Sequence, residues 1–183
     1  MSGQSMREIR SAPPLSLEEI LWSRERRAET QRQVLAMGEG TLICLTLNIA
    51  GAVKSAPPFR KAFEEGKSRI LAQLRREGAD ILVQKERHGK TGDELYLLAG
   101  LDLMTTKRRM VEIEEGFPLG RLLDIDVMAQ DGTKISRQQL GLPARRCLVC
   151  GEAAAACARS RRHDPQTLLQ RTVELIDGYF EGK

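Results

Sequence analysis

A short stretch of alternating side chains constrains the fold of this chain more than any other feature of its sequence. Within Gly120–Met128, apolar residues occupy positions 123, 125 and 127, and Asp124 and Asp126 lie between them. In an extended strand, successive side chains point to opposite faces, so the apolar positions share one face and the two aspartates share the other. The pattern therefore predicts a half-buried strand over Arg121–Ala129, with a hydrophobic core on one side only.

The paired carboxylates indicate a metal site. Mg²⁺ prefers oxygen ligands and usually completes its coordination with water and substrate phosphates. A metal-bound phosphate is a better electrophile, because the cation neutralises the charge that develops. Gly120 would let a phosphate approach the backbone closely, and Arg121 adds a positive charge beside it. The alternative is a half-exposed strand whose outward positions happen to be acidic, since the D-x-D pattern alone is common.

The rest of the chain alternates between predicted helices and strands. Ser16 and Glu19 have the spacing of a capping box at the start of the first helix, and Asp131-Gly132 is a strong hairpin signal. Helices are predicted from Ser16 to about Gly38 and over Phe59–Glu77, Leu103–Glu115 (with a strand as the alternative), Glu152–Ser160 and Pro165–Phe180; strands are predicted over Thr41–Leu47, Asp80–Arg87, Asp93–Leu98 and Thr133–Ser136.

These elements predict one α+β domain. A chain of 183 residues fits a single domain. Mixed helices and strands with a hairpin favour a mixed or mostly antiparallel sheet flanked by helices. Residues 1–14 are expected to form a flexible N-terminal tail, and residues 15–183 a single domain.

Positive charge is concentrated in one segment. The chain has a net charge of +4, and residues 145–163 hold five arginines against Glu152 alone. This segment accounts for the whole excess, which favours a local cationic site over a surface that follows a nucleic acid. No apolar run approaches the roughly 18 residues of a membrane span, and the N-terminus has no signal-peptide pattern. We expect a cytoplasmic protein that binds neither membranes nor nucleic acids.

A cysteine and histidine motif overlaps this segment. Cys147, Cys150, Cys157 and His163 have the spacing C-x2-C-x6-C-x5-H. Thiolates and imidazole suit tetrahedral Zn²⁺, and the first pair matches a zinc knuckle. The alternative is that the cysteines only pack, with Cys157 as a small hydrophobic residue of a helix.

Two further groups of basic residues could bind phosphates. On a helix, Arg159, Arg162 and His163 would share a face and could clamp a di- or triphosphate. Lys54 lies in a glycine-containing loop after a buried strand, a place where a loop can contact a phosphate. The alternatives are a solvated basic face and an ordinary surface turn.

Two blocks of sequence resemble a known family. One is Pro118–Arg121 leading into Asp124–Val127, and the other is Arg145–Cys150 followed by Ala156–Arg159 and His163. In combination these blocks resemble the apo-citrate lyase phosphoribosyl-dephospho-CoA transferases, also called holo-citrate lyase acyl-carrier-protein synthases. The resemblance spans nearly the full chain.

The resemblance implies an enzyme that attaches a prosthetic group. The donor would be triphosphoribosyl-dephospho-CoA, the acceptor a serine of the acyl-carrier (gamma) subunit of citrate lyase, and the leaving group pyrophosphate. Asp124 and Asp126 would hold Mg²⁺, and Asp126, Asp124 and water all remain open as the general base. The catalytic residues expected are Asp124, Asp126 and Arg121. By inference from the residues themselves, substrate phosphates and the leaving pyrophosphate would be neutralised by Arg121, Lys54, Arg159 and Arg162, with Gly120 and His163 also in the substrate site.

Alternatives remain at this point. The same chemistry could serve the carrier of malonate decarboxylase, or the chain could be a non-enzymatic zinc-knuckle binding module. A nucleotidyltransferase-like fold would bring a third carboxylate to the aspartate pair, with Glu112, Glu114 and Asp93 as the candidates.

Overall fold

A four-stranded antiparallel sheet forms the centre of the structure, a computed structural model that describes residues 2–182. Each pair of neighbouring strands is antiparallel, so the predicted α+β class and mostly antiparallel sheet are confirmed. The order across the sheet is β2 (Ile81–Arg87), β3 (Glu94–Ala99), β1 (Thr41–Leu47) and β4 (Leu123–Met128). β4 therefore lies at an edge, directly beside β1.

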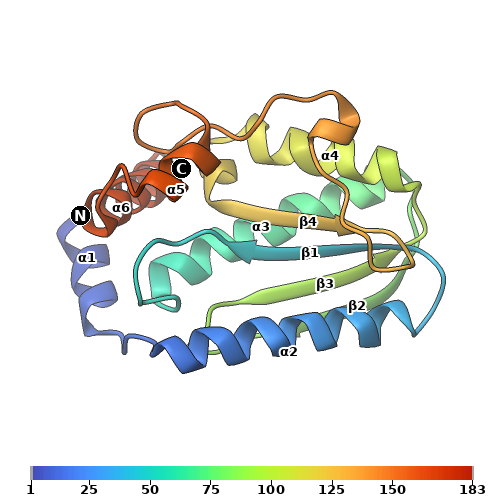
Figure 1. Ribbon diagram of the computed structural model, residues 1–183, viewed down its shortest axis with the longest axis horizontal. Helices are drawn as coiled ribbons and strands as arrows, with labels where there is room; N and C mark the ends of the chain where they lie inside the picture. Colours follow the sequence, from blue (N-terminus) through green and yellow to red (C-terminus); the bar gives the residue numbers. More distant parts are fainter. Residues whose placement is uncertain (1, 183) are drawn as a thin grey trace.

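Helices cover both faces of this sheet. In Figure 1, α2 runs along the front of the sheet and α3 lies behind it. None of the helices within residues 2–182 is long and apolar enough to cross a membrane. The helices are α1 (Ser2–Ser11), α2 (Leu17–Leu35), α3 (Pro57–Arg76), α4 (Leu103–Gly116), α5 (Ala154–Ser160) and α6 (Pro165–Glu181), with 3₁₀ turns η1 (Pro118–Leu122) and η2 (Gln138–Leu140).

The face toward α3 carries the main hydrophobic core. Alternate residues of the strands, such as Leu45, Leu97 and Ile125, point to this face and are at most 2% exposed. They pack against α3, where Phe59 and Phe63 are fully buried, and against residues of α1, α4 and α6. This face is closed along its length, and we call it the closed face.

The opposite face is covered by α2 and has a smaller core. Val34 and Leu35, at the end of α2, pack against Leu42 of β1 and Leu98 of β3. Toward its N-terminus α2 carries polar and basic residues over the sheet instead, so its apolar packing is confined to the last turn of the helix. We call this the open face. Asp124 and Asp126 belong to it.

The structure corrects the predicted N-terminal tail. Ser2–Ser11 forms a helix, and Ile9 is 1% exposed within the main core. The hydroxyl of Ser5 also donates a hydrogen bond of 2.5 Å to Asp177 of α6. Ile9 docks this short helix on the main core together with Met6 and Ala12, which are partly buried against it.

Smaller differences concern the ends of elements. β4 begins at Leu123 rather than at Arg121, because Pro118–Leu122 forms a 3₁₀ turn. Residues 133–136 form no named strand and pair with β4 only through a bridge between Met128 and Lys134. Leu103–Gly116 is a helix, so its strand alternative is wrong. The predicted capping box at Ser16 is confirmed.

Candidate active site

The two aspartates of β4 lie side by side on the open face. Asp124 lies opposite Thr46 of β1, and Asp126 lies opposite Cys44. A carboxylate oxygen of Asp126 is 2.6 Å from the Lys134 ammonium, whereas Asp124 is 3.5 Å from the nearest guanidinium nitrogen of its partner, an arginine. Asp124 is thus the less neutralised of the pair.

The environment of Asp124 disfavours its negative charge. Its side chain is half exposed but lies at the wall of a cavity, and this partial burial raises the pKa of its carboxyl. The neighbouring charge of Asp126 raises the pKa further, while Arg145 opposes the shift. A divalent cation would relieve both effects, so the two carboxylates fit the oxygen ligands that Mg²⁺ requires.

Side chains of α4 and of Arg145 form hydrogen bonds to the backbone of β4 along the edge that has no partner strand. The backbone N–H of Ile125 donates to Glu114, and its carbonyl accepts from Lys107, both at 3.2 Å. Arg145 donates to the carbonyl of Leu123. These contacts satisfy backbone groups that an edge strand would otherwise leave unpaired. They also fix the position of the strand that carries the aspartates.

Each candidate third carboxylate has another partner. Glu114 is buried and ion-paired with Arg137, although its charge contributes to the raised pKa of Asp124. Asp93 lines the same cavity as Asp124 but is ion-paired at 2.6 Å with an arginine of α3. Glu112 is exposed and pairs with an arginine of its own helix. Of the three, Glu114 is the one whose charge acts on Asp124, and Asp93 is the one that shares its cavity; both are already ion-paired with arginines.

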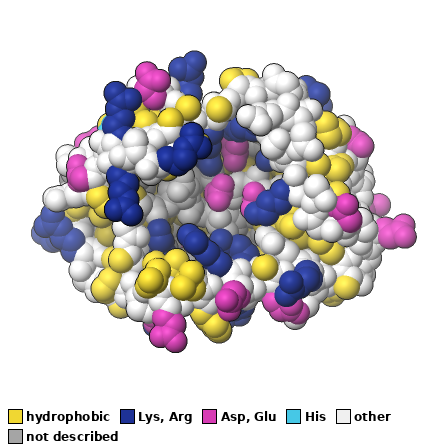
Figure 2. All heavy atoms as spheres, viewed as in Figure 1, with side chains coloured by type: hydrophobic (Ala, Val, Ile, Leu, Met, Phe, Trp, Pro, Cys, Tyr) yellow, Lys and Arg dark blue, Asp and Glu magenta, His cyan; other side chains and the backbone are white. Residues whose placement is uncertain are grey.

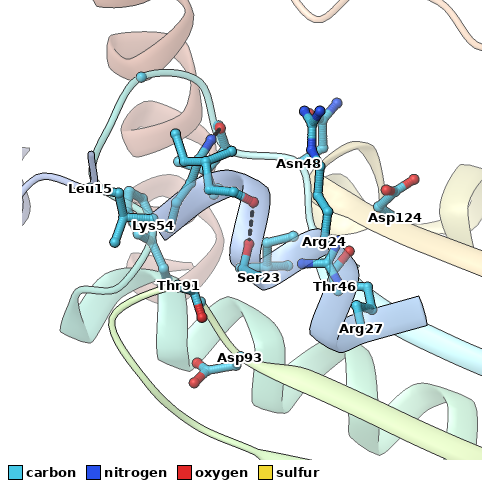
Figure 3. Close-up of a pocket in the computed structure, with 16 residues that line it drawn as sticks. Leu15, Ser23, Arg24, Arg27, Thr46, Asn48, Lys54, Thr91, Asp93 and Asp124 are labelled. Carbon is cyan, nitrogen blue, oxygen red and sulfur yellow. Dashed lines mark hydrogen bonds between the residues drawn. The ribbon is translucent and has the colours of Figure 1, made fainter. Parts of the chain in front are cut away.

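A cavity of about 330 Å³ opens between α2 and the ends of β1 and β4. Figure 2 shows a hollow on this side of the molecule, with acidic side chains inside it and Lys and Arg side chains around it. Arg24 and Arg27 line it from α2, Lys54 from the loop after β1, and Asp124 from β4 (Figure 3).

Two cations of this first cavity have no counter-ion. Arg24 makes no salt bridge with any residue between 2 and 182, while Arg27 is paired with the buried Glu94. The Lys54 ammonium donates to the carbonyl of Ile49 and reaches no carboxylate among the same residues. Burial lowers the pKa of Lys54, and the charge of Arg24 lowers it further. An anion such as a polyphosphate would remove this repulsion.

A second cavity of about 430 Å³ adjoins the first, since Asn48 lines both. Its wall contains Leu148, Leu168 and several alanines, so it offers an apolar surface next to guanidinium groups. Burial lowers the pKa of Arg121, as do the neighbouring arginines 145 and 137. Four arginines line this cavity, namely Arg121, Arg145, Arg146 and Arg161.

The four residues of the C-x2-C-x6-C-x5-H motif come together beside the second cavity. The ligand atoms of Cys147, Cys150, Cys157 and His163 all lie within 4.8 Å of one another. This Cys₃His cluster could bind a metal such as zinc.

The family model for apo-citrate lyase phosphoribosyl-dephospho-CoA transferase matches residues 15–179. The chain belongs to this family. It is 34% identical to a curated member from Citrobacter koseri, with 88% of each chain covered, and 33% identical to one from Escherichia coli, with 93% of each chain covered. It is also 34% identical to the Haemophilus influenzae Protein CitXG, of which it spans 36%.

Within this transferase family, the structure gathers most of the predicted site residues around the two cavities. Lys54 and Asp124 line the first, and Arg121 and His163 line the second. Asp126 lies next to Asp124 on β4. The residues that sequence reasoning singled out are therefore close in space, although they come from distant segments.

Two predicted phosphate ligands are placed elsewhere. Arg159 and Arg162 are exposed and line neither cavity. The predicted helical face of Arg159, Arg162 and His163 is wrong, because α5 ends at Ser160 and Arg161 adopts a left-handed conformation with φ of 48°. This turn brings Arg161 into the second cavity in place of Arg162.

Gly120 has a different role from the predicted one. It is buried, and a Cβ atom added to it would lie 2.4 Å from the carbonyl oxygen of Glu114. The missing side chain therefore lets η1 pack against the end of α4, rather than making room for a phosphate. Gly120 affects the site only through the position of η1, because η1 is followed directly by β4 and its aspartates.

Several cavity residues received no site role from the sequence, although Arg24 was among the residues that fit the family resemblance. Arg24 and Arg27 have the i, i+3 spacing of one helix face, but charged residues occur on all sides of α2, so spacing alone does not identify the inward face. Arg145 and Arg161 were counted in the cationic segment without a separate role. Asn48 carries no signal in the sequence beyond its place after a buried strand.

Proposed function

We propose that the protein transfers phosphoribosyl-dephospho-CoA from its triphosphoribosyl donor to a serine of the citrate lyase acyl-carrier subunit, with pyrophosphate as the leaving group. Family membership supports this donor and acceptor. The structural observation that carries the proposal is that Asp124 shares a cavity with Arg24 and Lys54, which have no carboxylate partner among residues 2–182, and that this cavity adjoins a second one lined by arginines.

The reaction is a phosphoryl transfer of the nucleotidyltransferase type. The serine oxygen attacks the phosphorus next to the ribose, the bond from that phosphorus to the pyrophosphate oxygen breaks, and the serine proton passes to a base. Asp124 lies at the cavity wall, 3.5 Å from Arg145, whereas Asp126 is 2.6 Å from Lys134, so Asp124 is the less neutralised carboxylate and the one that faces the donor.

The two cavities divide the donor between them. The triphosphate occupies the first cavity, where Arg24 and Lys54 balance its charge and stabilise the pyrophosphate that leaves. The dephospho-CoA part occupies the second, where arginines meet its diphosphate and apolar residues meet its organic portion. Asp124 and Asp126 would hold Mg²⁺, which supplies charge neutralisation at the reacting phosphate when bound.

Intact-mass measurement of the carrier tests this function. Incubation of the citrate lyase carrier with the donor and the wild-type protein should increase the carrier mass by one prosthetic group and release one pyrophosphate. Asp124→Asn and Asp126→Asn should each slow the transfer at least about a hundredfold. Asp131→Asn, the same substitution in the exposed hairpin, is the control and should transfer normally. Normal transfer by both site variants would exclude the proposed role of the pair.

The same assay tests the acceptor. Supplying the malonate decarboxylase carrier instead of the citrate lyase carrier should give little or no mass increase. A faster reaction with the malonate decarboxylase carrier would reassign the acceptor while keeping the chemistry. No mass increase on either carrier would contradict the transferase function.

A further inference from the structure

We propose that Cys147, Cys150, Cys157 and His163 bind one structural Zn²⁺, which shapes the wall of the second cavity. The distances fit this ion. The sulfurs of Cys150 and Cys157 are 3.5 Å apart, and the Nε2 atom of His163 is 3.3 Å from the sulfur of Cys150. Tetrahedral Zn²⁺ with Zn–S bonds of about 2.3 Å places its sulfur ligands about 3.8 Å apart. All three cysteines are free of disulfides.

The first two ligands lie on a tight turn of the kind that holds zinc. Cys147 donates its backbone N–H to Glu152 at 2.6 Å, and its carbonyl accepts from Gly151 at 3.3 Å. Gly151 has φ of 75°, a conformation that glycine adopts without strain. The sulfur of Cys147 accepts a hydrogen bond from the backbone N–H of Val149. The turn therefore directs both thiols toward the same point.

The other two ligands come from α5 and the turn after it. Cys157 projects from the helix, and the chain then reverses at Arg161 to bring His163 back. Arg161 is the only residue other than glycine with positive φ within residues 2–182. This conformation is unfavourable for a residue with a side chain, and here it is what allows the imidazole to complete the cluster.

Little else holds this segment together. Between residues 141 and 163 the only buried side chain is that of Cys157, which is itself one of the proposed ligands. Leu148 packs partly against the main core, but the segment has no core of its own and so has few interactions to offset its loss of conformational entropy. A bound metal supplies that stabilisation in small metal-binding modules.

The same segment builds the cationic wall of the second cavity. Arg145 lies two residues before the first ligand, and Arg161 lies two residues before the last. Arg145 also donates to the carbonyls of Arg121 and Leu123 and lies 3.5 Å from Asp124. The zinc site does not depend on the proposed function, whereas its effect on the donor rests on it. Loss of the metal should loosen the segment that carries these arginines and free Arg161, so the cationic wall of the cavity should weaken.

Metal analysis of protein purified without chelators tests the site directly. Wild-type protein should contain about one zinc per chain, and Cys150→Ser and Cys157→Ser should each retain less than about a tenth of it. Cys44→Ser changes the buried cysteine of the sheet and should keep the full zinc content. Wild-type protein that holds no zinc and takes up none when it is added would overturn the proposal, as would full zinc in both ligand variants.

Two measurements on the wild-type protein avoid variants that fail to fold. Replacement of the metal by Co²⁺ should give the intense near-ultraviolet absorption of thiolate ligands; its absence would exclude cysteine coordination. Removal of the metal should speed tryptic cleavage within residues 145–162 at least about tenfold while the sheet stays intact. Equal cleavage with and without zinc would overturn the structural role.

The link to the second cavity has its own readout. Metal-free protein should bind dephospho-CoA, the probe for this cavity, at least about tenfold more weakly than the zinc form. If the protein holds zinc but its metal-free and zinc forms bind dephospho-CoA with equal affinity, the link between the zinc and the cavity would be overturned. Zinc-loaded protein that transfers nothing to either carrier would contradict the proposed function and leave the zinc site standing, so the two failures are distinguishable.

Discussion

The two faces of the sheet are built from the same strands but differ in what covers them. On the closed face, α3 and its neighbours bury alternate strand residues completely, and the described residues there are almost all apolar. On the open face, α2 buries apolar residues near its end only, and Arg24 and Arg27 stand over the rest. β4 therefore has two roles. Its apolar residues at 123, 125 and 127 stabilise the fold, and Asp124 and Asp126 on the other face carry charge.

Substitutions in the closed face should reduce stability most. Phe63→Ala removes a fully buried ring of α3 and should lower the free energy of unfolding by about 3–5 kcal/mol. The folded fraction should keep its affinity for the donor, because the ring does not reach either cavity. Urea unfolding and donor titration measure the two quantities.

Leu21→Ala provides the control for this comparison. Leu21 is a large apolar residue of α2 that is 48% exposed, so its removal should change the free energy of unfolding by less than about 0.5 kcal/mol. Similar losses for Phe63→Ala and Leu21→Ala would show that the closed face is not the main source of stability.

A smaller loss of stability is expected at Gly120, which lies in η1, the turn that leads into β4 and its aspartates. The added methyl group of Gly120→Ala would meet the backbone of Glu114, which cannot rotate away, and should cost about 1–3 kcal/mol of unfolding free energy. The added methyl group should displace η1, which leads through Arg121 into β4 and so to Asp124. Transfer should therefore fall even in the folded fraction. Chemical unfolding and the carrier-mass assay check both expectations.

Gly116→Ala is the matched control, because Gly116 ends α4 and has open space around it. Alanine there should be neutral or slightly stabilising, by up to about 1 kcal/mol. A loss of stability as large as that of Gly120→Ala would contradict the packing role assigned to Gly120.

On the open face, removing one cation should affect binding more than stability. Arg24→Ala deletes a guanidinium without a salt-bridge partner among residues 2–182, so the fold loses little. Binding of the triphosphate donor should weaken about tenfold, because a charge-assisted contact is lost. Arg32→Ala, an exposed arginine near the other end of α2, should bind the donor normally. Equal effects of the two substitutions would remove Arg24 from the site.

The sequence predicted the closed face better than the open one. Alternation of apolar residues and the paired aspartates located β4 within two residues at its start, because burial on one side leaves a period of two in the sequence. The strand β1 was predicted with its observed bounds for a related reason: it is a continuous apolar run in the middle of the sheet.

The open face escaped prediction because charged residues have no periodic requirement. Arg162 was preferred to Arg161, although only a left-handed turn at Arg161 decides which of them faces the cavity. Gly120 was assigned to a ligand because a missing side chain can make room for either a phosphate or a helix. Such choices depend on where distant segments meet, and no local pattern records that.

The charge of Asp124 should change the free energy of unfolding only slightly, and its sign shows whether the open face lowers stability. The pKa of Asp124 is raised in the folded protein by burial and by Asp126, so the folded state binds its proton more tightly than the unfolded state. Ionisation of Asp124 therefore opposes folding. Below the usual aspartate value of 3.8, Asp124→Asn should match the wild type in stability. As the pH rises through the raised pKa, the variant should become the more stable of the two.

Urea unfolding of both proteins across this pH range measures the difference, which should be small because the half-exposed side chain is screened by solvent. Asp131→Asn is a control of opposite sign, since hydrogen bonds from Thr133 lower the pKa of Asp131 and its charge favours folding. That variant should be the less stable at neutral pH and should approach the wild type as the pH falls. An Asp124→Asn protein that is less stable than the wild type at neutral pH would show that the aspartate pair contributes to folding, and the division of tasks between the two faces would fail at its most important residue.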